Sequence, residues 1–211
     1  MEEIILLGIG GHAHSVVDSI EQSGKYRIIG FLDIEERKGM QYKEYKVIGT
    51  DDMLEQYFRQ GVRNAFVTVG YMGHGSVRKN LYFELKRIGY QIPNIIDNTA
   101  VLAKDIIYGE GNFIGKQAIV NAGAQIGDMC ILNSASVVEH DCKVGSFSHL
   151  AVGSVLCGGA RIGEETFVGA NAVVIQEISV GSKAIIGAGT VITKNVSDEI
   201  IKYGVIERKR E

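Results

Sequence analysis

A histidine with acidic neighbours stands in the C-terminal half of the chain, where His140 follows Glu139 and precedes Asp141. Histidine titrates close to neutral pH, so a neutral imidazole can take a proton from an amine or a hydroxyl during group transfer. A neighbouring carboxylate can orient the ring and stabilise the imidazolium that forms. We therefore predict that His140 is a general base and that Asp141, or Glu139, is its carboxylate partner.

Glycines and a second histidine near His140 suit the transfer of an acyl group. The tetrahedral intermediate of such a reaction carries an oxyanion, and a backbone N–H at Gly158 or Gly159 could stabilise it. His149 is the second histidine of this region. Cys157 has no evident base to activate it, and the three cysteines contain no C-x-x-C pair. We predict neither a thiol nucleophile nor a metal site.

A six-residue repeat must position these residues. Every sixth residue from Leu102 is apolar, without insertion, at Leu102, Tyr108, Ile114, Val120, Ile126, Leu132, Val138, Val144, Leu150, Leu156, Ile162, Val168, Val174, Val180, Ile186 and Ile192. A period of six fits neither an α-helix nor a simple alternating strand. It is typical of hexapeptide β-helix repeats, in which three hexads form one coil of a triangular prism. We predict that residues 98–211 form a parallel β-helix domain of about five coils.

The residues that precede the apolar repeat positions should point outward, and they fall into three columns. One column holds Phe113, Ile131, His149, Phe167 and Ile185, the second Ile119, Val137, Val155, Val173 and Val191, and the third Gln125, Lys143, Arg161, Ser179 and Ser197. Two prism walls are therefore apolar outside, and exposed apolar stripes of that length mark interfaces. Two such walls fit a closed threefold ring, so we predict a homotrimer. His149 interrupts an apolar column, so we expect a site at the subunit boundary there.

The N-terminal half, residues 1–97, has a different pattern. Strands are expected at Ile4–Leu7, Tyr26–Leu32 and Ala65–Val69, helices at about Ala13–Ser23, Met53–Gln60 and Ser76–Ile88, and solvated surface around Tyr42–Tyr45. Strands that alternate with helices predict a small parallel sheet in a Rossmann-like α/β domain. Ligands of such sheets bind beyond the C-terminal strand ends, here Gly8–His12, Asp33–Ile34 and Gly70–Gly75. The domain is too short for a full dinucleotide fold, which favours a nucleotide such as UDP over NAD.

Composition narrows the class of protein. A net charge of −3 over 211 residues gives no electrostatic reason to expect nucleic acid as a partner. The apolar run Ile4–Leu7 is too short for a signal peptide or a membrane span. Three cysteines without a paired motif fit a reducing compartment, so we expect a cytoplasmic protein.

Together these motifs resemble the bacterial nucleotide-amino-sugar N-acetyltransferase and sialic acid O-acetyltransferase family. The similarity spans a Gly-Gly-His loop after the first strand, Phe-Leu-Asp after the second, Val-Gly after the third and, most specifically, residues 136–159. The resemblance implies a left-handed β-helix and acetyl-CoA as co-substrate. Two departures are Asp141, where some members carry Glu, and the segment from Gly204 onward, which lacks the Pro-Ala found near the cofactor in relatives.

The resemblance also implies roles for single residues. His140 would be the base and Asp141 its partner, while His149 and the Gly158 amide would contact acetyl-CoA. The loops at Gly10, Gly11, His12, Asp33 and Gly70 would hold the nucleotide-sugar. The leading hypothesis is N-acetylation of a UDP-linked amino sugar for surface glycans, in a trimer with active sites at subunit interfaces. The alternatives are O-acetylation of a sialic acid or related sugar, and a binding β-helix without catalysis.

Overall fold

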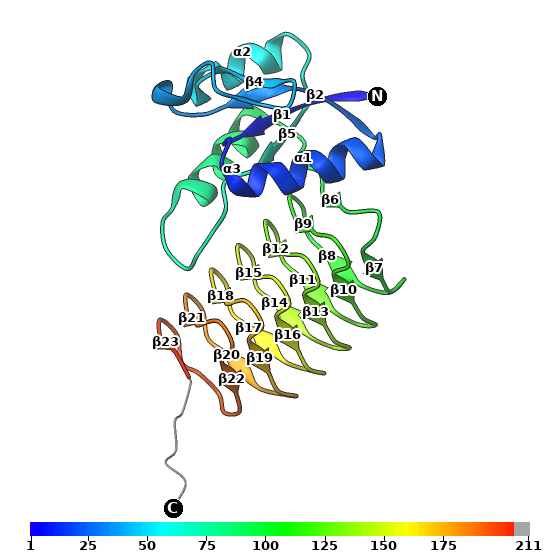
Figure 1. Cartoon of the computed structure of the whole chain (residues 1–211), viewed down its shortest axis with the longest axis vertical. Coiled ribbons are helices and arrows are strands. Elements are labelled where there is room, and N and C mark those ends of the chain that lie inside the picture. Colours follow the sequence, from blue (N-terminus) through cyan, green and yellow to red (C-terminus); the bar gives the residue numbers. More distant parts are fainter. Residues whose placement is uncertain (205–211) are drawn as a thin grey trace, which may run out of the picture.

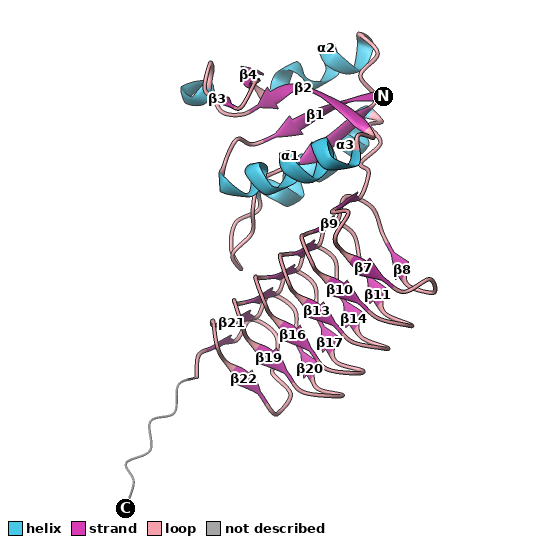
Figure 2. Ribbon diagram, turned by 45° about the vertical axis from the view of Figure 1, so that its right-hand side comes forward, coloured by secondary structure: helices cyan, strands magenta, loops and turns pink. Residues whose placement is uncertain are grey.

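The computed structural model describes residues 1–204, so residues 205–211, with most of the divergent C-terminal segment, lie outside the described residues. An α/β domain stands on one end of a long prism, and α1 lies between the two (Figure 1). Figure 2 shows the same stacked arrangement from a second direction. Among the described residues, no helix is both long and apolar enough to cross a membrane.

The N-terminal domain is a five-stranded sheet with strand order β3-β4-β2-β1-β5. Its elements are β1 (Glu2–Leu7), α1 (Gly11–Ser23), β2 (Tyr26–Leu32), β3 (Gln41–Tyr42), β4 (Tyr45–Gly49), α2 (Leu54–Arg59), β5 (Asn64–Val67) and α3 (Val77–Ile88), with short 3-10 turns at Glu35–Arg37 and Asp51–Met53. All neighbouring strands are parallel except β3 and β4. Ile4 and Leu6 of β1 pack with α1, and Ile5 and Leu7 pack with α2 and α3. Both faces of the sheet are therefore covered, as is usual for parallel strands.

In the stretch Tyr42–Tyr45, where the sequence predicts solvated surface, Lys43 and Glu44 are exposed, while Tyr42 and Tyr45 are partly buried. The strand that begins at Tyr45 was not predicted. Strand β4 joins the sheet beside β2, and Val47 is buried there. A tight turn at Lys43, with φ of 52°, pairs β3 with β4 in a short hairpin. The stretch alternates between exposed and buried residues over only five positions, which is too short to stand out as a strand by pattern alone.

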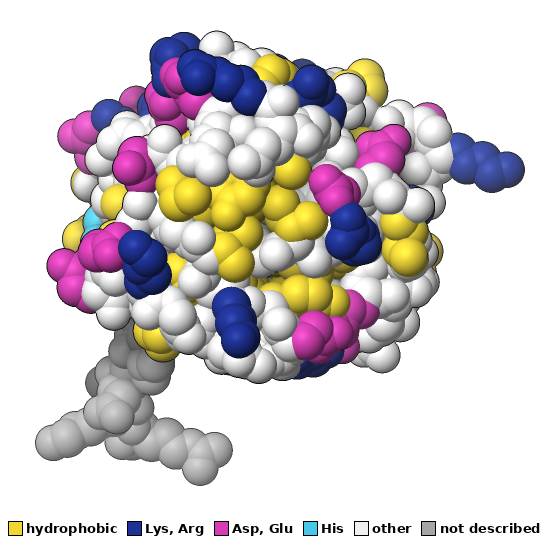
Figure 3. Space-filling model, turned by 90° about the horizontal axis from the view of Figure 1, so that it is seen from above, with side chains coloured by type: hydrophobic (Ala, Val, Ile, Leu, Met, Phe, Trp, Pro, Cys, Tyr) yellow, Lys and Arg dark blue, Asp and Glu magenta, His cyan; other side chains and the backbone are white. Residues whose placement is uncertain are grey.

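The outer face of the domain carries an apolar area bordered by charged side chains (Figure 3). Acidic and basic groups are interspersed around this area (Figure 3). Charges of both signs side by side produce no strong field of one sign. This face therefore has no electrostatic feature that would attract a polyanion.

The prism is built from three parallel sheets, which we call walls 1, 2 and 3. Wall 1 holds β6 (Ile95–Ile96), β9 (Phe113–Ile114), β12 (Ile131–Leu132), β15 (His149–Leu150), β18 (Phe167–Val168), β21 (Ile185–Ile186) and β23 (Ile201–Lys202). Wall 2 holds β7 (Val101–Leu102), β10 (Ile119–Val120), β13 (Val137–Val138), β16 (Val155–Leu156), β19 (Val173–Val174) and β22 (Val191–Ile192). Wall 3 holds β8 (Ile107–Tyr108), β11 (Gln125–Ile126), β14 (Lys143–Val144), β17 (Arg161–Ile162) and β20 (Ser179–Val180). The predicted fold class, an α/β domain followed by a left-handed parallel β-helix, is confirmed.

The repeat positions point inward and form one continuous core along the prism. Tyr108 in the first coil is the exception, because it remains 42% exposed. Strand pairs are eighteen residues apart through Val174 and Ile192, after which Val180 pairs with Val196 and the last coil is two residues shorter. The first prism strand, β6, lies two residues before the domain boundary that the sequence predicts at residue 97.

Wall 1 is not an exposed apolar stripe, which corrects one step of the expectation from the outward columns. Phe113 and Ile131 are buried in a cluster with residues of α1 and the sheet. Further down, the loop after β5 covers the wall, and a side chain on Gly73 would meet Ile185 and Phe167. The outward columns do not distinguish contact with another subunit from contact with the chain's own N-terminal domain. Within residues 1–204, wall 2 is the apolar wall that remains uncovered.

Candidate active site at a prism corner

His140 and Asp141 lie at the turn between β13 of wall 2 and β14 of wall 3. Asp141 adopts the left-handed backbone conformation, with φ of 61°, which Asp tolerates better than most residues. His140 Nδ1 lies 2.9 Å from Asp141 Oδ2. A carboxylate only accepts hydrogen bonds, so the neutral ring carries its proton on Nδ1 and keeps the lone pair on Nε2. This is the tautomer that a general base requires.

The surroundings of His140 strengthen it as a base. The hydrogen bond that His140 donates to Asp141 is the main cause that raises the pKa of His140, and the charges of Asp141 and Glu139 act in the same direction. The Glu139 carboxylate accepts the backbone N–H of His140 at 3.3 Å and makes no hydrogen bond with the ring. Of the two carboxylates that the sequence offers, Asp141 is therefore the one that contacts the imidazole. The side chain of His140 is 63% exposed, so a substrate can reach it.

Gly158 lies against His140 in the next coil. A Cβ built on Gly158 would stand 2.5 Å from Nε2 of His140, which is closer than real Cβ atoms approach. The ring can occupy this place only because position 158 has no side chain. Among residues 1–204 the Gly158 N–H donates to no other group, while its carbonyl accepts from Glu177. An open N–H beside an imidazole can stabilise the oxyanion of an acyl-transfer intermediate.

His149 lies on wall 1, away from the corner that carries His140, so one chain does not bring the two histidines together. Its Nδ1 donates to the carbonyl of Tyr71, and its Nε2 lies 3.4 Å from Nδ2 of Asn133. Burial lowers the pKa of His149 to about 4, and the charge of Arg78 acts in the same direction. His149 is therefore neutral near pH 7 and can hydrogen-bond, but it cannot serve as an acid there.

The structure brings together the five residues expected to hold a nucleotide-sugar. Gly10 precedes α1 as its N-cap, and substituents on Gly10 or Gly11 would meet nothing within 4 Å. The Asp33 carboxylate accepts the Ile9 N–H at 2.7 Å and so fixes the loop after β1. Gly70 lies against His12, whose Cβ would be 3.7 Å from a side chain at that position. The open backbone at the start of α1 is suited to bind phosphate.

A buried arginine, which the sequence did not single out, joins these loops to the prism. Arg78 is 3% exposed and donates to the carbonyls of Val67, Val69 and Met129. Burial and the charge of Arg78 lower the pKa of His12 to about 3, and Nε2 of His12 is buried without a partner. Arg78 occupies the buried face of α3 three residues before Leu81. That helical spacing is the signal that could have revealed it.

No group of three or more His, Cys, Asp or Glu side chains gathers within residues 1–204 in a way that could hold a metal ion. Cys130 and Cys142 are buried inside the prism, and burial raises the pKa of both thiols, to about 12 and about 11. A thiol with a raised pKa is a poor nucleophile at neutral pH. The chemistry available at the corner is therefore that of His140, Asp141 and the Gly158 backbone.

Comparisons with known proteins agree with this architecture. Residues 3–85 match the PglD N-terminal domain family, and residues 159–194 match the hexapeptide repeat of succinyl-transferase. A histidine-to-alanine variant of GDP-perosamine N-acetyl transferase from Caulobacter crescentus, solved with CoA and GDP-perosamine, is 30% identical with a TM-score of 0.90, and the match covers 97% of this chain and 94% of that one. The acetyltransferase domain of PglB from Neisseria gonorrhoeae FA1090 is 31% identical with a TM-score of 0.89, and the match covers 97% of both chains.

One curated relative, an uncharacterized protein of Acanthamoeba polyphaga mimivirus, is 27% identical over 125 residues, and the match spans 24% of its length. The two bacterial enzymes match over nearly their whole chains, in both the α/β domain and the prism. The resemblance inferred from the sequence motifs is thereby confirmed. The chain belongs to the hexapeptide-repeat family of sugar acetyltransferases that carry a PglD N-terminal domain.

Proposed function

We propose that this protein transfers the acetyl group of acetyl-CoA to the amine of a nucleotide-linked amino sugar, with His140 as general base. The observation that carries the proposal is the contact of His140 Nδ1 with Asp141, 2.9 Å away, beside the bare backbone of Gly158. As the amine attacks the thioester carbon, Nε2 of His140 takes the proton that the nitrogen loses. When the C–S bond breaks, the imidazolium can return this proton to the thiolate. Asp141 stabilises the imidazolium between the two events.

The residues at the corner fit a thioester donor. The Gly158 N–H has no acceptor among residues 1–204 and lies beside the base, so it can meet the oxygen that becomes negative in the transition state. A bulkier residue at position 158 would fill the space that His140 occupies. When bound, acetyl-CoA supplies the activated acyl group, and the chain supplies the base and the oxyanion donor.

The sugar acceptor is proposed to enter through the N-terminal loops. Gly10, Gly11 and His12 form the open start of α1, whose N–H groups and dipole favour a diphosphate. We propose UDP as the nucleotide because the domain is a half-size dinucleotide fold. GDP is the competing choice, since a relative of 30% identity was solved with GDP-perosamine. The product would serve surface glycan assembly in the cytoplasm.

We infer a trimer with active sites at the subunit boundaries. The outward residues of wall 2 are apolar, and no part of residues 1–204 covers Val191, which is 57% exposed. The nucleotide loops of a chain lie over wall 1, whereas His140 lies at the corner of walls 2 and 3. An acceptor held by one chain is thus more accessible to the base of a neighbouring chain. This arrangement would also bring His149 of one subunit toward His140 of another.

The test is the release of free thiol from acetyl-CoA with a panel of UDP- and GDP-amino sugars and of free and CMP-linked sialic acids. We expect turnover with a nucleotide amino sugar and a loss of about 100-fold or more in His140→Ala, because general bases contribute on that scale. The variant should keep the oligomeric mass of the wild type, since His140 is exposed. Near-normal turnover in His140→Ala would refute the mechanism. Acetylation of only the sialic acids would replace N-transfer by O-transfer.

A further inference from the structure

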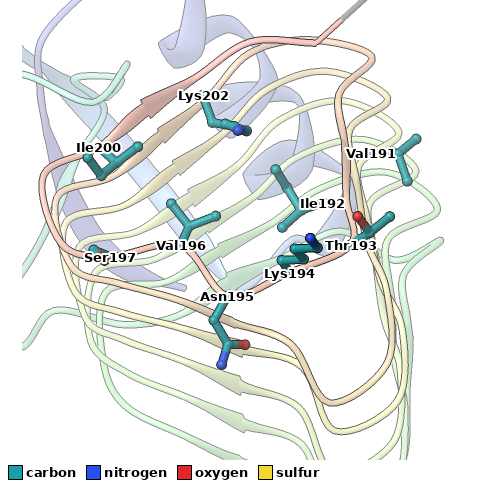
Figure 4. Close-up of a pocket in the computed structure, with 9 residues that line it drawn as sticks. All are labelled: Val191, Ile192, Thr193, Lys194, Asn195, Val196, Ser197, Ile200 and Lys202. Atoms are coloured by element: carbon teal, nitrogen blue, oxygen red, sulfur yellow. The ribbon is translucent and has the colours of Figure 1, made fainter. Parts of the chain in front are cut away.

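The α/β domain closes one end of the prism and leaves the other end open. At the open end, a pocket of about 290 Å³ is lined by Ile192 and Val196 of the last coil (Figure 4). At the closed end, Phe113 and Ile131 of wall 1 are buried in one cluster with residues of α1. The position of the domain on the prism is therefore fixed by contacts at the closed end, where the sheet and its helices meet the first coils.

Buried polar contacts join the two parts at this end. Ser19 of α1 donates to the Asp97 carboxylate, directly after β6, at 2.6 Å, and both residues are 1% exposed. Arg78 of α3 donates to the carbonyl of Met129, in the turn between β11 and β12, at 2.9 Å. Ser19 lies about 12 Å along α1 from its first residue, since a helix rises about 1.5 Å per residue. Arg78, by contrast, contacts the chain next to the loops expected to hold the acceptor.

Arg78 completes the free edge of the N-terminal sheet. Strand β5 is the edge strand, and Thr68, just after it, donates its N–H to the carbonyl of Leu7 on the β1 side. Successive residues of an extended chain turn their backbone groups to opposite sides, so the carbonyls of Val67 and Val69 face away from β1. Nη1 of Arg78 donates to these carbonyls at 2.9 and 3.0 Å. A buried backbone carbonyl needs a partner, and here the guanidinium takes the place of a further strand.

The guanidinium holds these groups as a rigid fork. Its donors leave a planar group in fixed directions, so Nε and Nη2 reach Met129 while Nη1 reaches the edge of β5. Burial lowers the pKa of Arg78 to about 10, so the side chain stays charged near pH 7. Among residues 1–204 it forms no ion pair, and three carbonyls are its hydrogen-bond partners. A buried charge without a carboxylate depends on these carbonyls, so the distance between β5 and the Met129 turn has little freedom.

The segment that Arg78 holds also places the loops expected to bind the acceptor. A Cβ built on Gly8 would lie 2.7 Å from Cγ2 of Val69, so the loop after β1 rests directly on Val69. Gly70 follows Val69 in the chain. His149 of wall 1 donates to the carbonyl of Tyr71, so the segment is tied to the prism on both sides of Gly70. A movement of Val69 would therefore move both loops.

We propose that Arg78 is a positioning residue for the nucleotide-sugar: it holds Val69, and thereby Gly70 and the loop after β1, in a fixed place relative to the prism. This inference rests on the proposed function, which assigns these loops to the acceptor. Arg78 is 3% exposed, so it acts through the carbonyls that it binds and not by contact with the acceptor. When the hold is released, only a fraction of the molecules has both loops in place, and the apparent Kd rises by the inverse of that fraction.

Calorimetric titration of the full-length protein tests the proposal, with UDP and GDP as probes of the acceptor site and CoA as the probe of the donor site. Arg78→Lys keeps the charge but replaces the fork by a single ammonium group. We expect it to weaken the binding of the nucleotide that the wild type prefers by about tenfold, which corresponds to loops in place for about one tenth of the time. CoA affinity should stay unchanged, because His140 and Gly158 lie on the prism, and it also shows that the variant is folded. Arg78→Gln, which carries no charge, should show the same loss.

Ser19→Ala is the matched control, because it removes the buried hydrogen bond to Asp97 at the same junction and leaves the hold on Val69 intact. It should bind both the nucleotide and CoA normally. In the transfer assay, the KM of the acceptor should rise about tenfold in Arg78→Lys while kcat stays near that of the wild type, the pattern of lost ground-state binding. Hydrogen exchange of the backbone N–H groups of residues 68–71, measured without ligand, should be faster in Arg78→Lys and unchanged in Ser19→Ala.

Equal nucleotide affinity in the wild type and Arg78→Lys would overturn the inference and leave the proposed function standing. An equal loss in Ser19→Ala would also overturn it, since any loosening of the junction would then have the same effect. Loss of CoA affinity together with nucleotide affinity in both Arg78 variants would overturn it as well, because the whole fold would then depend on Arg78. A wild type that binds neither nucleotide and acetylates no nucleotide-sugar would refute the proposed function, and the acceptor role of Arg78 with it.

Discussion

The Gly158→Ala variant should displace the His140 ring without lowering the stability of the prism. The new Cβ would lie 2.5 Å from Nε2 and 2.7 Å from Cε1 of His140, so the ring must move. Because the His140 side chain is 63% exposed, it can swing into solvent at little cost to the core. The swing breaks the contact with Asp141 and takes the lone pair away from the acyl group. We expect the turnover rate to fall by about 100-fold or more, the scale of a lost general base.

The stability of the Gly158→Ala variant should not fall together with its turnover rate. At a glycine without strained φ, alanine stabilises a protein by about 0.4–1 kcal/mol, because it restricts the unfolded chain. The midpoint of thermal unfolding should therefore stay constant or rise slightly. Proton NMR of the unliganded protein should show the pKa of His140 fall back toward its ordinary value, since the Asp141 hydrogen bond that raises it is lost. Gln176→Ala, one coil further along the corner, is the control. A His140 pKa that stays raised in Gly158→Ala, as in the wild type, would contradict the steric reasoning, even if activity fell.

Three further predictions follow from the same contacts. Asp141→Asn removes the group that raises the pKa of His140, so the acidic limb of the pH profile of kcat/KM should shift to lower pH; an unshifted limb would exclude Asp141 as the partner. Val173→Asp on wall 2 should lower the mass seen by light scattering and abolish transfer, whereas an intact trimer would show that wall 2 is not the interface. The folded-state pKa values of His12 and His149, about 3 and about 4, lie below that of unfolded histidine, so the unfolded state binds more protons and stability falls as pH drops below 6.5. Between pH 7 and pH 5 the free energy of unfolding should fall by about 2 kcal/mol for each histidine, and His149→Gln should remove about half of this decrease in urea titrations.

The prism was predictable because its repeat is strictly local. Each hexad places one apolar residue inward, and sixteen consecutive hexads leave no other regular structure with that period. The same spacing predicts that position 158 stacks on position 140, since the two differ by one coil of eighteen residues. The spacing does not predict the direction in which a side chain points. That the His140 ring rests on Gly158 depends on the turn conformation of Asp141, which the structure supplies.

The sequence pattern did not predict the contacts between the two halves of the chain. The outward column of wall 1 is apolar because α1 and the loop after β5 pack on it, and an apolar column does not reveal whether its partner is the same chain or another. His149 shows the same limit, since its partner Tyr71 is 78 residues away in sequence. Arg78 binds carbonyls of both halves and was hidden in a helix whose charged residues usually face solvent.

Burial of wall 1 makes assembly and catalysis depend on the same surface. Residues 1–204 cover wall 1 and leave wall 2 free for a partner, and His140 lies at the edge of wall 2. The loops proposed to bind the acceptor lie over wall 1, so an isolated subunit would hold the proposed sugar on one side of the prism and the proposed base on another. We infer that a contact through Val173 would bring the loops of one subunit toward the base of the next. On this inference Val173→Asp loses activity because the subunit contact is lost, whereas His140→Ala loses it because the base is lost. A mixture of the two variants should recover transfer only where hybrid trimers form.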